Sequence, residues 1–153
     1  MKTKLCIVSL LSFLILYGDC KVFQTFKDEE MISCYFHFLC DLNETDGMYQ
    51  IVEESTDKVK VKFWEIMKEV FDVLAGQSRE DFEVYKVTVC SYTEEGRKAA
   101  FNELASLGFE HGLVTCVNPY SKFCKESDDF VMRCAAHVKE MTESDECKSH
   151  RSK

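Results

Sequence analysis

After residue 20 the sequence has no apolar run long enough to cross a membrane. A spanning helix needs about 20 consecutive apolar residues, so we expect no membrane span in this part of the chain. Blocks of Lys and Arg are also missing, and the 153 residues carry a net charge of −8. An acidic surface without a basic block repels nucleic acid and anionic lipid. We therefore expect neither nucleic acid nor a membrane as a partner.

The sequence also lacks the signatures of common enzyme classes. No serine lies in a Gly-x-Ser-x-Gly turn, and no glycine-rich phosphate loop occurs. Paired acids such as 29–30 and 128–129 fit helix starts and solvated faces better than acid/base couples. The chain has no internal repeat and no linker between domains. We therefore predict a single non-enzymatic domain with no catalytic residue, no cofactor and no metal site.

The N-terminal end of the sequence predicts where the protein functions. Lys2 and Lys4 precede an apolar run at 5–17, which small residues and then a polar chain follow. This pattern is typical of a secretory signal peptide, and the run is too short for a membrane span. We expect a signal peptide at 1–20 and a secreted, extracellular protein. Its removal changes the net charge from −8 to −9, because two lysines and Asp19 leave with it.

Cysteine is abundant, with nine residues in the chain. In an exported protein they are expected to form disulfides, each contributing about 2 to 4 kcal/mol. Cleavage after Cys20 leaves seven cysteines and cleavage after Gly18 leaves eight, and both alternatives stay open. The candidates are Cys20, Cys34, Cys40, Cys90, Cys116, Cys124, Cys134 and Cys147.

Helix geometry restricts how these cysteines pair. Cys34 and Cys40 would lie about 9 Å apart along a helix axis, beyond the roughly 7 Å that a disulfide tolerates. Each is therefore expected to bond to another element. We predict bridges that link the first helix and the third helical segment to the C-terminal half.

Hydrophobic periodicity predicts the secondary structure. Apolar residues recur at three- and four-residue spacing in five segments. These are 28–42, 56–75, 79–92, 93–107 and 127–141. Ser78 with Asp81 resembles a capping box, but residues 82–90 are rich in β-formers, so a strand there is an open alternative. We predict an all-α, single disulfide-stapled bundle of four to five helices over 21–142, followed by a polar C-terminal tail at 143–153.

The second helical segment has an unusually wide apolar stripe. Such a stripe belongs at the centre of a bundle, either as plain core or as the wall of an apolar ligand pocket. The candidate pocket residues are Phe36, Phe63, Trp64, Met67, Phe71 and Tyr85.

A glycosylation motif follows the first helix. Asn43-Glu44-Thr45 is an acceptor triplet in a predicted surface turn of an exported chain. We expect a glycan on Asn43, with an unused motif as the alternative.

The segment 34–40 resembles part of a family signature. Secreted phospholipases A2 carry Cys-Cys-x-x-His-Asp-x-Cys in a helix, and Cys34, His37 and Cys40 fall in that register. Ser33 and Phe38 replace the first cysteine and the calcium-binding aspartate, so the resemblance implies no hydrolysis. We interpret His37 as an aromatic-flanked core or boundary residue. Insect odorant-binding proteins are similar only in architecture, because their C-x3-C spacing is absent here.

These observations favour a secreted binding protein that carries a small apolar ligand inside a helical bundle. The alternative is a secreted effector, such as a venom component, hormone-like or defence protein, that acts by surface contact with an extracellular protein target; a structural role ranks third. A carrier would need an internal cavity of roughly 300 Å³ or more, lined by residues such as Phe36, Trp64 and Tyr85. The sequence leaves the ligand, the target and the oligomeric state open.

Overall fold

The protein is all-α. The structure, a computed structural model, describes residues 29–72, 76–113, 118 and 120–151. The predicted signal peptide at 1–20, with Cys20, and the candidate Cys116 lie outside these residues. The elements are α2 (Glu29–Phe36), a π-helix η1 (His37–Asp41), α3 (Asp46–Glu53), α4 (Asp57–Val70), α5 (Arg79–Cys90), α6 (Glu94–Glu110), α7 (Lys122–Glu143) and α8 (Asp145–Arg151).

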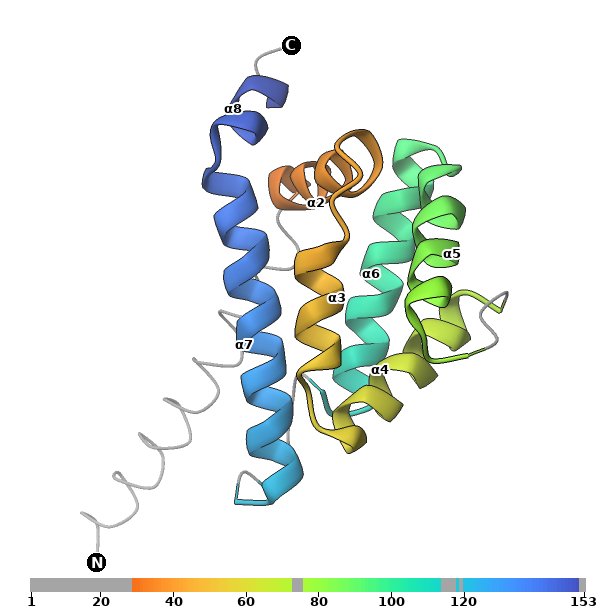
Figure 1. The fold of residues 1–153 in the computed structure, drawn as a ribbon, viewed down its shortest axis with the longest axis vertical. Coiled ribbons are helices and arrows are strands. Elements are labelled where there is room, and N and C mark those ends of the chain that lie inside the picture. Colours follow the sequence, from red (N-terminus) through yellow and green to blue (C-terminus); the bar gives the residue numbers. More distant parts are fainter. Residues whose placement is uncertain (1–28, 73–75, 114–117, 119, 152–153) are drawn as a thin grey trace, which may run out of the picture.

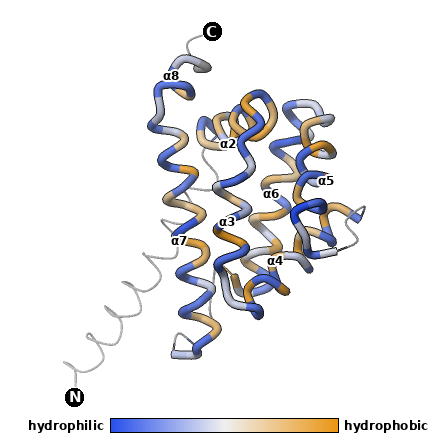
Figure 2. Tube along the Cα trace, viewed as in Figure 1, coloured by the Kyte–Doolittle hydropathy of each residue, from blue (hydrophilic) through white to orange (hydrophobic). Residues whose placement is uncertain are grey.

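The helices pack around one core. The long helix α7 runs along one side of the molecule beside α3, and α5 and α6 form the other side (Figure 1). Helix α2 lies across one end of this group, while α4 crosses obliquely near the other end and contacts α6 and α7. Hydrophobic and hydrophilic residues alternate along α3, α6 and α7 (Figure 2), as expected for helices with one buried face. No described helix is long and apolar enough to span a bilayer.

Two described disulfides fasten the bundle at the end where α2 lies (Figure 1). Cys34 in α2 bonds to Cys147 in α8, and Cys40 in η1 bonds to Cys90 in α5. The first helix is therefore linked to the C-terminal half, as predicted. The third helical segment is linked to the first one, so the prediction that it is joined to the C-terminal half is wrong. The Cys34 bridge also holds the predicted polar tail, because α8 lies within 143–153 and Cys147 is fully buried.

The start of α5 confirms the predicted capping box. The Ser78 hydroxyl accepts a hydrogen bond from the Asp81 amide, and the Asp81 carboxylate accepts one from the Ser78 amide at 3.2 Å. Residues 82–90 are helical, so the strand alternative is wrong. The reason is packing, since Phe82, Tyr85 and Val89 recur at helical spacing and are all buried.

Several boundaries differ from the prediction. Helix α7 begins at Lys122 because Ser121 caps it, accepting a bond from the Cys124 amide at 3.0 Å. Ser127, the predicted start, is instead buried within the helix. Helix α6 continues through Gly108 to Glu110. The short helices α3 and α8 add to the predicted bundle.

Candidate functional site

A partly open cavity of about 160 Å³ lies in the core of the bundle. Six helices, α2 to α7, and the segment that follows α6 contribute to its wall. Its lining residues are Tyr35, Met48, Phe63, Ile66, Met67, Tyr85, Phe101, Leu104, Ala105, Gly108, Leu113, Phe130, Val131, Cys134 and Val138. The side chains of this set contain only two oxygen or nitrogen atoms, the hydroxyls of Tyr35 and Tyr85. The cavity is therefore an apolar site with one polar position.

Aromatic contacts hold part of the wall in place. Phe63 of α4 packs edge-on against Phe130 of α7, with 5.8 Å between the ring centroids. Tyr35 of α2 lies 5.6 Å from Phe101 of α6, again centroid to centroid. Such edge and tilted contacts between rings are favourable beyond the area they bury. They join helices that are distant in sequence around the same space.

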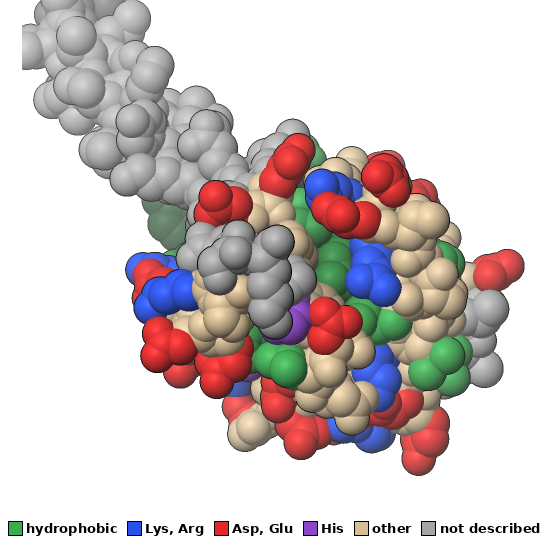
Figure 3. Space-filling model, turned by 90° about the horizontal axis from the view of Figure 1, so that it is seen from above, with side chains coloured by type: hydrophobic (Ala, Val, Ile, Leu, Met, Phe, Trp, Pro, Cys, Tyr) green, Lys and Arg blue, Asp and Glu red, His purple; other side chains and the backbone are tan. Residues whose placement is uncertain are grey.

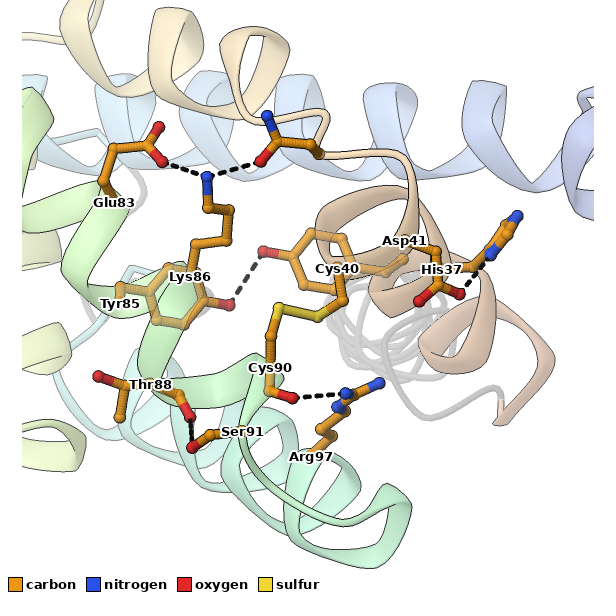
Figure 4. The surroundings of a disulfide bond; sticks show 12 residues. His37, Cys40, Asp41, Glu83, Tyr85, Lys86, Thr88, Cys90, Ser91 and Arg97 are labelled. Atoms are coloured by element: carbon orange, nitrogen blue, oxygen red, sulfur yellow. Dashed lines mark hydrogen bonds and ion pairs between the residues drawn. A yellow bond between two sulfur atoms is a disulfide. The ribbon is translucent and has the colours of Figure 1, made fainter.

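The polar position is a pair of buried tyrosines. The hydroxyl oxygens of Tyr35 and Tyr85 are 3.0 Å apart and share a hydrogen bond. Burial raises the pKa of Tyr35 to about 12 and raises the pKa of Tyr85 well above its usual value. Both phenols are therefore uncharged at neutral pH and act as hydrogen-bonding groups. Figure 4 shows Tyr85 on α5 with this bond as a dashed line, near the disulfide that joins Cys90 of the same helix to Cys40 of η1.

Cys134 is the free thiol among the described cysteines, and it lines the cavity from α7. Burial raises the pKa of this thiol to about 12. Because the thiolate is the nucleophilic form, Cys134 is a weak nucleophile at neutral pH. Cys124 is disulfide-bonded, in addition to the two bridges that fasten the bundle.

The predicted pocket residues divide between the cavity and the surrounding core. Phe63, Met67 and Tyr85 line the cavity. Phe36, Trp64 and Phe71 are buried elsewhere in the core, each at most 4% exposed. The cavity also uses Met48 of α3 and several α7 side chains that sequence reasoning had not assigned to a pocket. The apolar periodicity of 127–141 predicts a helix with one buried face in that part of α7, but α3 itself was not predicted.

His37 lies in the π-helix, away from the cavity. Its Nδ1 is 2.7 Å from a carboxylate oxygen of Asp41, and its ring meets Phe38 edge-on at 6.1 Å between centroids. The side chain is 16% exposed, which places it at the boundary of the core. Among the described residues, no group of three or more His, Cys, Asp or Glu side chains could hold a metal ion.

Asn43 stands in the exposed turn between η1 and α3. Its φ of 58° lies in the left-handed region, which asparagine tolerates better than most residues. The side-chain oxygen accepts a bond from Lys86 Nζ at 2.7 Å (Figure 4). Thr45, the third residue of the acceptor triplet, is buried, and its hydroxyl donates a hydrogen bond to the Glu83 carboxylate at 3.1 Å. Glycosylation of Asn43 stays a prediction.

Comparison of the chain with protein-family models, with curated proteins and with solved structures finds no match. A function can therefore be inferred only from the chemistry of the molecule itself, above all from its cavity.

Proposed function

We propose that this chain is a secreted, non-enzymatic binding protein that holds a small apolar molecule in the central cavity. The observation that carries the proposal is the cavity, about 160 Å³ in volume and lined almost entirely by hydrocarbon. Export is supported by the disulfides, which form and persist in oxidising compartments. Among the described residues, the lining has no histidine, carboxylate or lysine, and its thiol stays protonated at neutral pH. It therefore offers no general base for catalysis.

An unfilled cavity of this size is costly. At about 24 cal/mol per Å³, a closed, dry void of 160 Å³ forgoes about 4 kcal/mol of packing stability, which is an upper value for this partly open cavity. That is a large fraction of the roughly 5 to 15 kcal/mol by which domains are stable. A ligand that fills the cavity recovers these contacts, which supports binding as its role.

The size of the cavity restricts the ligand. It is about 160 Å³, smaller than the roughly 300 Å³ that we expected for a carrier. An apolar protein cavity of about 150 Å³ accommodates benzene. The ligand proposed here is therefore a compact molecule of benzene-like size, since a long-chain lipid would not fit inside.

The outer surface supports the surface-acting alternative less well. Figure 3 shows acidic and basic side chains interspersed over one face, with hydrophobic atoms between them. The large hydrophobic side chains that are exposed are distributed over several elements; they are Leu42, Val61, Val84, Val87, Tyr92, Phe109, Tyr120 and Met132. Single exposed apolar residues of this kind are normal on a soluble protein.

The proposal is tested by titrating the purified, oxidised protein with toluene, followed by ligand-observed NMR and calorimetry. We compare two variants of α6. Ala105 lines the cavity, so Ala105→Leu places three additional carbon atoms in the binding space. Ala99 is exposed on the same helix, so Ala99→Leu is the matched control.

We expect saturable binding of toluene to the wild type, and affinity at least about tenfold weaker in Ala105→Leu, equivalent to about 1.4 kcal/mol. Ala99→Leu should bind as the wild type does. Absence of saturable binding to the wild type below about 1 mM would overturn the proposal. Equal affinities in both variants would place the toluene site elsewhere and would overturn it too.

A further inference from the structure

The tyrosine pair in the cavity leaves one hydroxyl proton without an acceptor. Each phenol carries one proton, and the two oxygens, 3.0 Å apart, share a single hydrogen bond. Whichever tyrosine donates, the proton of the accepting tyrosine has no hydrogen-bond acceptor among the described residues. Tyr35 and Tyr85 are 7% and 2% exposed, so bulk water reaches neither side chain freely.

A buried donor without an acceptor is uncommon. Buried polar groups in folded proteins are almost always hydrogen-bonded, because leaving one unpaired loses the bonds that it made with water. Phenylalanine at both positions would have kept the shape of the rings without either hydroxyl. The unpaired donor belongs to two residues that line the apolar cavity described above, next to the space that a bound molecule would occupy.

We propose that the molecule bound in the cavity is apolar but carries one uncharged oxygen acceptor, such as the carbonyl of a ketone, aldehyde or ester, which accepts the remaining Tyr35–Tyr85 proton. This inference rests on the proposed function of the cavity. The cavity also disfavours charged ligand groups, because the part of its lining that the structure describes contains no Lys, Arg, His, Asp or Glu to pair with them. Burying a carboxylate or an ammonium group there would leave its charge uncompensated.

Two probes of nearly the same shape test the inference. Acetophenone carries a carbonyl group where α-methylstyrene carries C=CH₂, so only the first can accept a hydrogen bond. Their affinities are measured by calorimetry for the wild type and for the double variant Tyr35→Phe with Tyr85→Phe. The double variant is needed, because in either single variant the remaining hydroxyl still has a proton to donate. Tyr92→Phe, at an exposed tyrosine outside the cavity lining, is the matched control.

We expect the double variant to bind acetophenone about tenfold more weakly than the wild type, the effect of losing one buried hydrogen bond. Its affinity for α-methylstyrene should be unchanged or higher, and Tyr92→Phe should match the wild type for both probes. If the double variant binds both probes as the wild type does, the oxygen acceptor is wrong while the apolar binding site stands. If toluene binds the wild type but neither probe does, the inference fails while the apolar binding site stands. If neither the probes nor toluene bind, the proposed function itself fails.

A second measurement needs no variant. The infrared stretch of ¹³C-labelled acetophenone bound to the wild type should lie below its position in hexane, because accepting a hydrogen bond weakens the carbonyl bond. A stretch at the hexane position would show that the bound carbonyl accepts no hydrogen bond, and would overturn the inference.

Discussion

Replacing Trp64 by alanine should strongly destabilise the protein. Trp64 lies in the middle of α4 and is 1% exposed. Its ring meets Phe63 edge-on, with 5.3 Å between centroids. The side chain does not line the cavity, so its contribution is packing and not ligand contact. The substitution therefore tests the core of the bundle separately from the binding site.

The magnitude follows from the buried area. A buried aromatic side chain removes about 150 to 250 Å² from water, which at about 25 cal/mol per Å² corresponds to roughly 4 to 6 kcal/mol. The unfolded chain already shields part of that area, so this is an upper range. Substitutions of buried Phe or Trp by Ala cost about 3 to 5 kcal/mol. We expect Trp64→Ala to lower the free energy of unfolding by this amount.

The assay is urea unfolding of the oxidised protein, followed by far-UV circular dichroism. Tryptophan fluorescence cannot serve, because Trp64 is the only tryptophan in the chain and the variant removes it. Val61→Ala is the control on the same helix, since Val61 is 41% exposed and should change the free energy of unfolding by about 0.5 kcal/mol or less. A loss below about 1 kcal/mol in Trp64→Ala would refute the placement of Trp64 in the core.

Three further predictions concern the disulfides, the tyrosines and the free thiol. Replacing Cys40 and Cys90 together by serine should cost about 4 kcal/mol in urea unfolding, the loop-entropy value for their sequence separation of 50, and an unchanged midpoint would contradict this. The pKa values of Tyr35 and Tyr85 are raised by burial, so the folded state holds both protons more tightly than the unfolded state. The stability that the two protonated tyrosines contribute is complete below about pH 10 and is lost as the pH rises toward their pKa values in the folded state. The free energy of unfolding should therefore fall above about pH 10, and it should fall less steeply in the variant with phenylalanine at both positions. Iodoacetamide should modify Cys134 slowly in the native protein and rapidly in urea, as read by mass spectrometry; rapid native modification would show an accessible thiolate.

The sequence predicts the secondary structure correctly where local signals and the pattern of buried residues agree. The Ser78–Asp81 capping box opens α5 as predicted, and helical spacing outweighed the β-forming residues that follow. It was a poor guide for α3, whose second residue is Gly47 and whose eight residues make a marginal helix in isolation. In the fold α3 packs on α7, and Gly47 permits a close approach: a Cβ there would lie 2.3 Å from Cε1 of His137. This support comes from a helix far along the chain, and no local pattern reveals it.

The cavity was predictable only in part, for a related reason. Neighbouring residues of a helix are turned by about 100° from one another, so Phe63 and Trp64 lie on the same wide stripe of α4 but not on the same side. Phe63 reaches the cavity, while Trp64 fills the core beside it. A broad apolar stripe indicates a central helix. Which residues of that stripe line the cavity depends on the helices that face it, here through residues such as Phe130 of α7.

The disulfides and the cavity fit together energetically. In the loop-entropy account a disulfide stabilises a protein by restricting the unfolded chain, so its contribution does not depend on filling the interior. The Cys40–Cys90 bridge alone is worth about 4 kcal/mol on that account, similar to the cost of leaving 160 Å³ unfilled. The two bridges also fasten the helices that carry the tyrosine pair, since Cys34 is next to Tyr35 in α2 and Cys90 is in α5 with Tyr85. Covalent links outside the cavity can thus offset its cost and fix its polar position, leaving the space inside for a ligand.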